Sequence, residues 1–296
     1  MYKCIVYGVG KDYNQYINSL RFYEQLQTIK ILGVSSKQQI YEKVDGYDFI
    51  SKEQLLCLDY DLIVITSARF FMEIRKDLIE LGIDEEKLMP AHVFTHPELD
   101  LDKYLQLKKS KPSIFAIHCW GGVTYCGLGL KFLSPFINMW EEAEDYLKIL
   151  QNPQEYLKHP VEFLEYAYDP LGKKEYPVGR LNDVKLHFNH YASYEKAVQK
   201  WDERKKRINW NNLFIMMYTE EKEVAKKFMD LPYKNKVCFV PFETKEESLF
   251  FIDYRNYPEL ENMGFARLVN QIAKGAYQYY DVIELLMGNI NKNRVI

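Results

Sequence analysis

The sequence lacks the cysteine pattern of a disulfide-stabilised protein. Its 296 residues include 5 cysteines, and no two of them form a CxxC pair: Cys4, Cys57, Cys119, Cys126 and Cys238. Because the number is odd and the spacing is wide, a disulfide framework is excluded and a reducing compartment is favoured. We therefore expect a cytoplasmic protein.

Long hydrophobic runs and a basic excess are also missing. No stretch approaches the roughly 18 apolar residues of a membrane-spanning helix, and Asp12 and Asn14 follow the first apolar run too closely for a signal peptide. Lys and Arg number 39 against 42 Asp and Glu, a formal net charge of −3. We therefore expect no integral membrane segment, no signal peptide and no general nucleic-acid binding.

The first hundred residues alternate strand and helix. Strands are predicted at Lys3–Tyr7 and in "IKILGVSS" and "DLIVITS". Helices are predicted at Asp12–Gln27 and in "RFFMEIRKDLIELGI", which Gly82 closes, and Ser51 is placed to cap another helix. Such βαβ units predict an α/β domain with a Rossmann-like parallel sheet, of the nucleotide-binding type, over residues 1–100.

A second domain is predicted after a charged segment bounded by prolines, which we expect to be a linker over residues 101–112. Residues 113–296 again have an α/β pattern, and we expect a mixed sheet. Strands are predicted at "VEFLEYAY", "VKLHFNHY", "LFIMMY" and "KVCFV". Helices are predicted at "MWEEAEDYLKIL", at "YEKAVQKWDERKKRI" with Ser193 as its cap, at residues 220–228 and at "YDVIELLMGN".

The first turn carries part of a dinucleotide-binding motif. Gly8 and Gly10 follow the first strand, where glycines allow a tight turn and a close approach of backbone to phosphate. The third glycine position holds Tyr13, and Ser35 and Ser36 stand where an acidic residue would hold a ribose. The motif is compatible with a nucleotide sugar, with a nicotinamide cofactor, or with a tight turn that binds nothing.

The stretch "IHCWGGVTY" places a reactive residue type where a strand should end in a turn. Cys119 is a candidate nucleophile, with His187 or His190 as its general base. Backbone N–H groups at Gly121 and Gly122 are candidates to bind an oxyanion. The alternative is that Cys119 is a small core residue.

The two histidines are not expected to share a metal. His187 and His190 are three residues apart on a predicted strand, which would direct them to opposite faces unless the strand ends between them. No metal and no certain cofactor is therefore predicted. Each histidine remains a candidate acid–base group.

Further ligand-binding candidates are polar or aromatic. Asn138 lies inside an apolar run, and Arg204 and Arg207 are spaced to share one side of a helix, where they would hold a phosphate. The alternative for the arginines is a solvated face balanced by neighbouring acids. The tryptophans could stack on a sugar ring or anchor the core, and they are Trp120, Trp140, Trp201 and Trp210.

Several of these stretches together resemble one bacterial family. They are "HCWGGVTYCGLGLKFLSPFINMW", "YPVGRLNDVKLHFNHYASYEKAVQKWDERKKRINWNNLFIM" and "LPYKNKVCFV", spread over roughly residues 113 to 260. The family is known as a domain of unknown function and is associated with exopolysaccharide or capsule biosynthesis. Many members have asparagine before the cysteine, where this chain has His118.

The first domain resembles a second group, on the stretches "YGVG", "VDGYDFIS" and "DYDLIVITS". These are Rossmann-like modules similar to the nucleotide-sugar-binding half of sugar acetyltransferases. Together the two resemblances imply a pathway, the synthesis of bacterial surface polysaccharide. They imply no specific reaction.

The function expected from these features is that of a transferase acting on a nucleotide- or lipid-linked sugar. One alternative is a non-catalytic protein of the same pathway, whose first domain senses a nucleotide sugar and whose second recruits an enzyme or supports a homo-oligomer. A weaker alternative is an NAD-dependent oxidoreductase.

Overall fold

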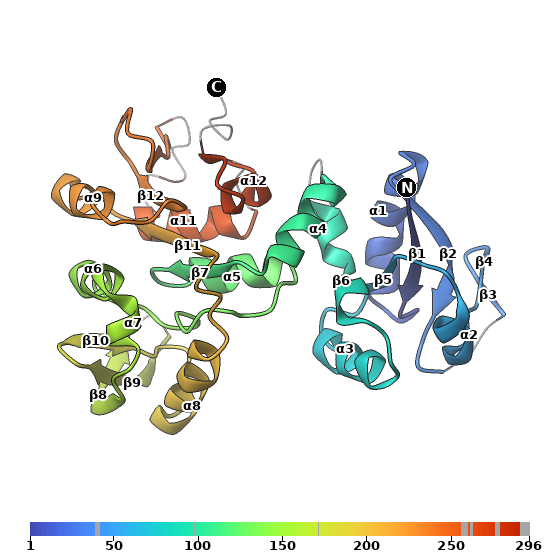
Figure 1. Cartoon of the computed structure of the whole chain (residues 1–296), viewed down its shortest axis with the longest axis horizontal. Helices are drawn as coiled ribbons and strands as arrows, with labels where there is room; N and C mark the ends of the chain where they lie inside the picture. The colour runs from blue at the N-terminus through green and yellow to red at the C-terminus, as the bar shows by residue number, and fades with distance from the viewer. Residues whose placement is uncertain are drawn as a thin grey trace. The chain divides into compact units, whose positions relative to one another are not determined.

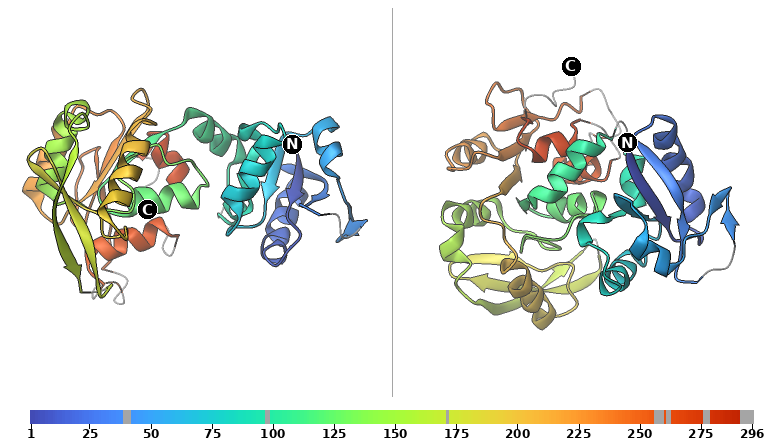
Figure 2. Two further views of the ribbon diagram at one scale, coloured as in Figure 1. Left: turned by 90° about the horizontal axis from the view of Figure 1, so that it is seen from below. Right: turned by 45° about the vertical axis from the view of Figure 1, so that its right-hand side comes forward.

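The computed structural model describes residues 1–38, 42–96, 99–170, 172–255, 260, 263–275 and 279–290. The chain divides into two compact units (Figures 1 and 2). Met1–Leu105 with Gly127–Gly129 form the first unit, and Gln106–Cys126 with Leu130–Ile296 form the second. The division falls inside helix α4 (Leu101–Ser110), which occupies most of the segment predicted to be a linker.

A parallel sheet in the order β2–β1–β5–β6 forms the core of the first unit. Its strands are apolar without alternation because both faces are covered, and every residue of β5 is buried. The predicted Rossmann-like parallel sheet is therefore confirmed. Its strands are β1 (Tyr2–Tyr7), β2 (Ile29–Ser35), β5 (Leu62–Ile65) and β6 (Leu88–Pro90).

Local sequence signals set the helix ends of the first unit. The Ser51 hydroxyl accepts the N–H of Gln54, and the Gln54 side chain accepts the N–H of Ser51, so the predicted cap is confirmed. The helices are α1 (Tyr13–Gln25), α2 (Lys52–Cys57) and α3 (Phe71–Glu80), with 3-10 turns η1 (Glu85–Lys87) and η2 (Ala91–Thr95). The strands β3 (Lys43–Val44) and β4 (Tyr47–Asp48) form a small antiparallel pair.

The turn after β1 depends on Gly8. Its φ is +104°, and a Cβ there would lie 2.7 Å from Thr66 Oγ1. The Thr66 hydroxyl donates to the Gly8 carbonyl at 2.7 Å, and the Gly8 N–H donates to the Ser35 carbonyl at 2.8 Å. A Cβ at Gly10 would meet nothing within 4 Å. The turn itself therefore requires the first glycine of the motif but not the second.

The second unit contains two sheets, one with parallel and one with antiparallel strands (Figure 1). A parallel sheet has the order β13–β12–β11–β7, and an antiparallel sheet has the order β10–β9–β8. The predicted α/β class is confirmed, and in place of one mixed sheet the parallel and the antiparallel strand pairs form two separate sheets. The strands are β7 (Ser113–Ala116), β8 (Val161–Asp169), β9 (Lys174–Leu181), β10 (Val184–His187), β11 (Leu213–Tyr218), β12 (Lys236–Val240) and β13 (Leu249–Phe251).

Amphipathic helices accompany these sheets. The Ser193 hydroxyl accepts the Lys196 N–H at the start of α8, which confirms the predicted cap. None of the helices in the described ranges combines the length and the apolar composition that crossing a membrane requires. The helices are α5 (Trp120–Gly127), α6 (Ala143–Gln151), α7 (Pro153–Tyr156), α8 (Tyr194–Lys205), α9 (Lys222–Met229), α11 (Phe265–Ala273) and α12 (Val282–Leu286).

Strand β9 is not predicted from the sequence, because Pro177 and Gly179 break its apolar pattern. The strand predicted over "VKLHFNHY" is also too long, since β10 ends at His187. The chain then turns, with the Tyr191 N–H donating to the Phe188 carbonyl at 3.0 Å. Because the strand ends between His187 and His190, the alternation of strand faces does not direct their side chains to opposite sides.

Replacing Gly8 by alanine should destabilise the first unit by about 1–3 kcal/mol, because an L-residue is strained at this positive φ and meets Thr66. Gly10→Ala is the matched control and should change stability by less than about 0.5 kcal/mol. Thermal unfolding followed by far-UV circular dichroism measures both. Equal melting temperatures for Gly8→Ala and the wild type would contradict this account of the turn.

Candidate functional site

The chemistry-bearing residues of the second unit gather at one edge of its parallel sheet. His118 and Cys119 follow β7, and Tyr218 is the last residue of the neighbouring β11. Parallel strands end at the same edge, and ligands of open α/β sheets bind outside this carboxyl edge. The fold therefore places these side chains where a ligand would be expected.

A thiol and an imidazole meet at this edge. The Sγ atom of Cys119 lies 3.4 Å from Nε2 of His190. Cys119 immediately precedes α5, and His190 lies in the turn after β10. Of the two histidines predicted as bases for this thiol, the structure brings His190 to it and holds His187 elsewhere.

Burial sets the protonation state of this pair. Burial raises the pKa of the Cys119 thiol, with a further contribution from the Glu141 carboxyl and an opposing one from Lys274. Partial burial also lowers the pKa of His190. At neutral pH a protonated thiol therefore faces a neutral imidazole that can accept its proton, as general-base activation of a nucleophile requires.

His118 forms a second polar pair beside the first. Its Nδ1 lies 2.9 Å from the hydroxyl of Tyr218. Burial lowers the pKa of His118 to about 4, so the ring is neutral at physiological pH. Its backbone has a φ of +58°, which costs energy in a residue other than glycine and is common at functional positions.

Glu141 is a buried acid without a counter-charge. Its side chain is 1% exposed, and neither carboxyl oxygen has a hydrogen-bond partner within the described part of the chain. Burial raises its pKa to about 8, and a backbone hydrogen bond from His118, whose geometry is too poor to satisfy either carboxyl oxygen, offsets only part of this effect. At neutral pH the group is mostly a neutral carboxylic acid, which can donate a hydrogen bond.

His187 is fixed on the ring of Trp140. The two rings stack with centroids 3.7 Å apart and planes 13° from parallel. The backbone N–H of Trp140 donates to the His187 carbonyl at 2.9 Å, and the backbone N–H of His187 donates to the Trp140 carbonyl at 3.0 Å. Burial lowers the pKa of His187 to about 4. The two backbone hydrogen bonds and the ring stacking therefore orient the indole of Trp140, while burial keeps the His187 ring neutral.

A cavity of about 210 Å³ opens at this edge. Its lining comes from the residues after β7, the end of β11 and the residues after it, the segment that leads into α6, and the start of α11: Ile117, His118, Trp140, Glu141, Glu142, Ala143, Tyr218, Thr219, Glu220, Phe265 and Ala266. The sequence does not predict His118, Glu141 and Tyr218 as site residues. The signal that could have indicated His118 and Tyr218 is a polar residue at the end of an apolar strand, here β7 and β11.

The predicted oxyanion donors lie in a helix and not in the expected turn. Gly121 and Gly122 belong to the first turn of α5, where backbone N–H groups have no partner within the helix. A Cβ at Gly121 would lie 3.1 Å from the Cβ of Ala116, so the helix packs closely on β7. Asn138 is exposed, with a φ of +62°, and lies near Gly122.

The two arginines are not brought together. Arg204 is 7% exposed, and its guanidinium donates to the Ile137 carbonyl at 3.2 Å and to the Tyr191 hydroxyl at 2.5 Å. Arg207 lies beyond the end of α8, with its guanidinium 3.7 Å from Glu203. The predicted shared helix side does not form, because Arg204 turns into the interior.

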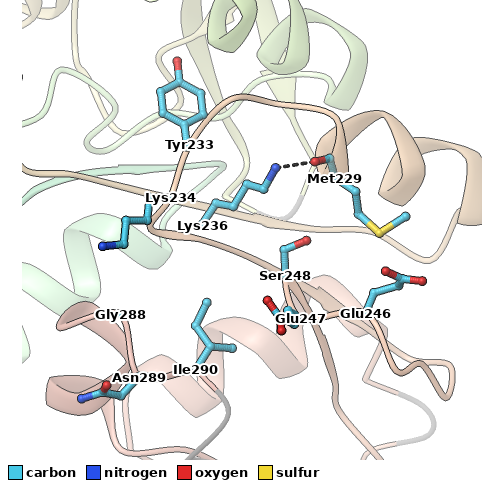
Figure 3. A pocket seen from close by; sticks show the side chains of 10 residues that line it. All are labelled: Met229, Tyr233, Lys234, Lys236, Glu246, Glu247, Ser248, Gly288, Asn289 and Ile290. Atoms are coloured by element: carbon cyan, nitrogen blue, oxygen red, sulfur yellow. Dashed lines mark hydrogen bonds between the residues drawn. The ribbon is translucent and has the colours of Figure 1, made fainter.

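A second cavity, of about 610 Å³, lies at the amino ends of β12 and β13 (Figure 3). Its buried cation, Lys236, donates to the carbonyl of Met229, the last residue of α9 (Figure 3), and to the carbonyl of Leu231 just beyond it. Burial lowers the pKa of Lys236. The Lys236 ammonium therefore satisfies carbonyl groups at the C-terminal end of α9, which is a structural role, and we do not choose this cavity as the candidate functional site.

The described residues contain no group of three or more His, Cys, Asp or Glu side chains that could hold a metal ion. In the first unit, the Asp12 carboxylate lies at the start of α1 and accepts the Ala68 N–H at 3.3 Å. A negative charge thus already stands at the helix terminus that a phosphate would approach. Gly8 and Gly10 remain predicted ligand contacts.

Removing the buried acid should change how stability depends on pH. Because the pKa of Glu141 is raised from 4.5 to about 8, the folded state keeps a proton that the unfolded state loses. Relative to Glu141→Gln, wild-type stability should therefore fall by about 1–2 kcal/mol between pH 6.5 and 8, and the histidines, whose ordinary pKa is 6.5, contribute equally to both proteins. Glu141→Gln should lack this fall in urea unfolding. Parallel pH profiles for the two proteins would contradict it.

Comparison with known proteins places this chain. Residues 91–287 match the family described as Domain of unknown function (DUF1919), and residues 1–89 match the family described as C2185-like, N-terminal. A Haemophilus influenzae protein, named Uncharacterized protein, is 39% identical over 131 residues, which are 43% of this chain. The chain spans 60% of the length of that relative.

The predicted resemblance of the second domain to a family of unknown function is thus confirmed. The match begins before the predicted segment and ends after it. It covers more than half of the chain, so the protein belongs to the DUF1919 family.

Proposed function

We propose that the second unit is a transferase of bacterial surface polysaccharide biosynthesis, which acts on a nucleotide- or lipid-linked sugar. The observation that carries the proposal is the 3.4 Å approach of Cys119 Sγ to His190 Nε2. The pair lies at the carboxyl edge of a parallel sheet, next to a cavity. His190 is exposed and Cys119 is half-buried, so a substrate can reach the thiol from solvent.

The chemistry that suits this pair is acyl transfer to a sugar hydroxyl. His190 would take the thiol proton while Cys119 Sγ forms a bond to the acyl carbon of a donor ester or thioester. The bond from that carbon to the leaving group breaks, and His190 returns the proton to the leaving group. A sugar hydroxyl then attacks the thioester, His190 takes its proton, and the thiol is restored.

The backbone beside the thiol supplies positive character. The first N–H groups of α5, at Gly121 and Gly122, have no partner within the helix. They would stabilise the oxyanion that forms on the acyl oxygen at each step. This is the role predicted for the two glycines from the sequence, and it suits their place at a helix start as well as a turn.

The pathway rests on sequence resemblance. The stretches around Cys119 and His190 resemble a family associated with exopolysaccharide or capsule biosynthesis, and the first unit resembles modules that bind nucleotide sugars. The parallel sheet of the first unit supports that second resemblance. A nucleotide sugar is therefore the proposed small-molecule partner.

A non-catalytic sugar-binding protein of the same pathway is the second candidate. One observation favours it: the cavity is lined by His118, and Cys119 is not among its described lining residues. A ligand could therefore bind there without touching the thiol. The test below separates the two candidates.

An activated acyl ester should label Cys119 selectively. With p-nitrophenyl acetate as the probe, peptide mass spectrometry should find the acetyl group on Cys119 before the exposed Cys57, which serves as the internal reference. His190→Ala should slow this labelling at least about 100-fold, because a general base contributes that much or more. His159→Ala is the matched control, and it should leave the rate unchanged.

Equal labelling of Cys119 and Cys57 would contradict the catalytic proposal and favour the binding protein. So would an unchanged rate in His190→Ala, provided that circular dichroism shows both variants to be folded.

A further inference from the structure

We propose that the cavity at the carboxyl edge of the second unit binds one uncharged hexose ring, the sugar that accepts the transferred group. The inference deepens the proposed function and rests on it for the acceptor role. The binding itself is argued from the residues that line the cavity.

The size of the cavity limits its ligand to about one ring. Its volume is about 210 Å³, below the roughly 300–1,000 Å³ typical of pockets for drug-sized molecules. A whole nucleotide sugar is larger than this space. The cavity therefore suits a single sugar unit whose remaining parts extend into solvent.

Aromatic rings supply the apolar contacts that the C–H faces of a sugar require. Trp140, Tyr218 and Phe265 all line the cavity. The stacked His187 fixes the indole of Trp140, and Tyr218 packs edge-on against Phe265 with centroids 6.2 Å apart. Rigid aromatic rings of this kind give contact area at little cost in conformational entropy.

Glu141 points to a polar ligand. The residue is among those that line the cavity and is 1% exposed, and its two carboxyl oxygens are closed off from solvent and lack a hydrogen-bond partner within the described ranges. A buried polar group without a partner costs stability, and a bound hydroxyl would remove that cost. As a neutral acid at pH 7, Glu141 can both donate to and accept from a sugar hydroxyl.

The remaining polar groups also match hydroxyls. The helices α6 and α11 begin at the cavity, and neither has a side-chain cap at its start, so their first N–H groups can donate to hydroxyl oxygens. The carboxylates of Glu142 and Glu220, both exposed residues of the lining, can accept from hydroxyl protons. A sugar hydroxyl both donates and accepts hydrogen bonds, so it can pair with the N–H donors of the helices and with the carboxylate acceptors.

A phosphate or another anion fits poorly. Among the described lining residues there is no lysine or arginine, and His118 is neutral. Glu142 and Glu220 would repel a negative charge at the opening. These carboxylates oppose the attraction that the two helix N-termini offer to an anion, so an uncharged ring suits this cavity better than the diphosphate of a nucleotide sugar. His118 lines the cavity and Cys119 follows it in the chain, so the ring would lie beside the thiol.

The test uses full-length protein with Cys119→Ser, which removes the thiol chemistry. Saturation-transfer NMR is recorded with methyl glycosides of glucose, galactose, mannose and N-acetylglucosamine, and with glucose 1-phosphate and glucuronic acid as anionic probes. At least one methyl glycoside should bind at millimolar concentration, and the anionic probes should bind more weakly.

Glu141→Leu in this background should weaken that binding at least about tenfold, the equivalent of one lost hydrogen bond. Glu246→Leu, which changes the lining of the second cavity, is the matched control and should leave binding unchanged. Because Leu resembles Glu in size and removes a buried polar group, Glu141→Leu should fold. Glu141→Gln, which keeps a donor and an acceptor, should retain most of the binding.

Absence of binding by every methyl glycoside at tens of millimolar would overturn the inference. So would binding that Glu141→Leu leaves unchanged, or an anionic probe that binds as well as the methyl glycosides. None of these outcomes affects the acetylation test, which needs only the thiol and His190, so failure of the cavity and failure of the catalytic pair can be told apart.

Discussion

The parallel sheet of the second unit determines where its chemistry lies, because strands that run in one direction end at one edge. The strands β7 and β11 are direct neighbours, so the residues that follow Ala116 and those that end at Tyr218 share that edge. The helices α6 and α11 begin at the cavity there. Tyr218 and Glu141 are thereby brought to His118 and Cys119, although no local sequence signal links these three segments.

Burial keeps the inner ionisable groups of this edge neutral. It raises the pKa of Cys119 and Glu141 and lowers that of His118 and His190. Neutral groups cost less to bury than an ion pair, and they suit proton transfer to and from an uncharged hydroxyl. The neutral states of the thiol–imidazole pair and of the groups beside it therefore follow from one physical condition, their full or partial burial at one edge of the sheet.

Local signals predict the elements well. The caps at Ser51 and Ser193 and the apolar strand β5 match their predicted positions, because capping and buried runs are properties of a few neighbouring residues. Strand β9 is missed because Pro177 and Gly179 are tolerated through contacts with strands on both sides. Those contacts are invisible in the segment itself.

The site is predicted only in part for the same reason. Cys119 and His190 are 71 residues apart, and they follow strands of two different sheets, β7 and β10, so that no local pattern predicts their approach. Glu141 stands in an acidic stretch that predicts the solvated start of a helix, but α6 begins at Ala143 and leaves Glu141 buried before it. No pattern of hydropathy in that stretch separates the buried acid from its exposed neighbours.

The most direct measurement is the pH dependence of Cys119 alkylation by iodoacetamide, followed at that residue by peptide mass spectrometry. The neutral thiol–imidazole pair predicts a midpoint above the ordinary thiol pKa of 9.0, because burial raises the pKa of this thiol. A midpoint well below that value, with fast alkylation near pH 6, would show a resting thiolate–imidazolium pair and would contradict the account.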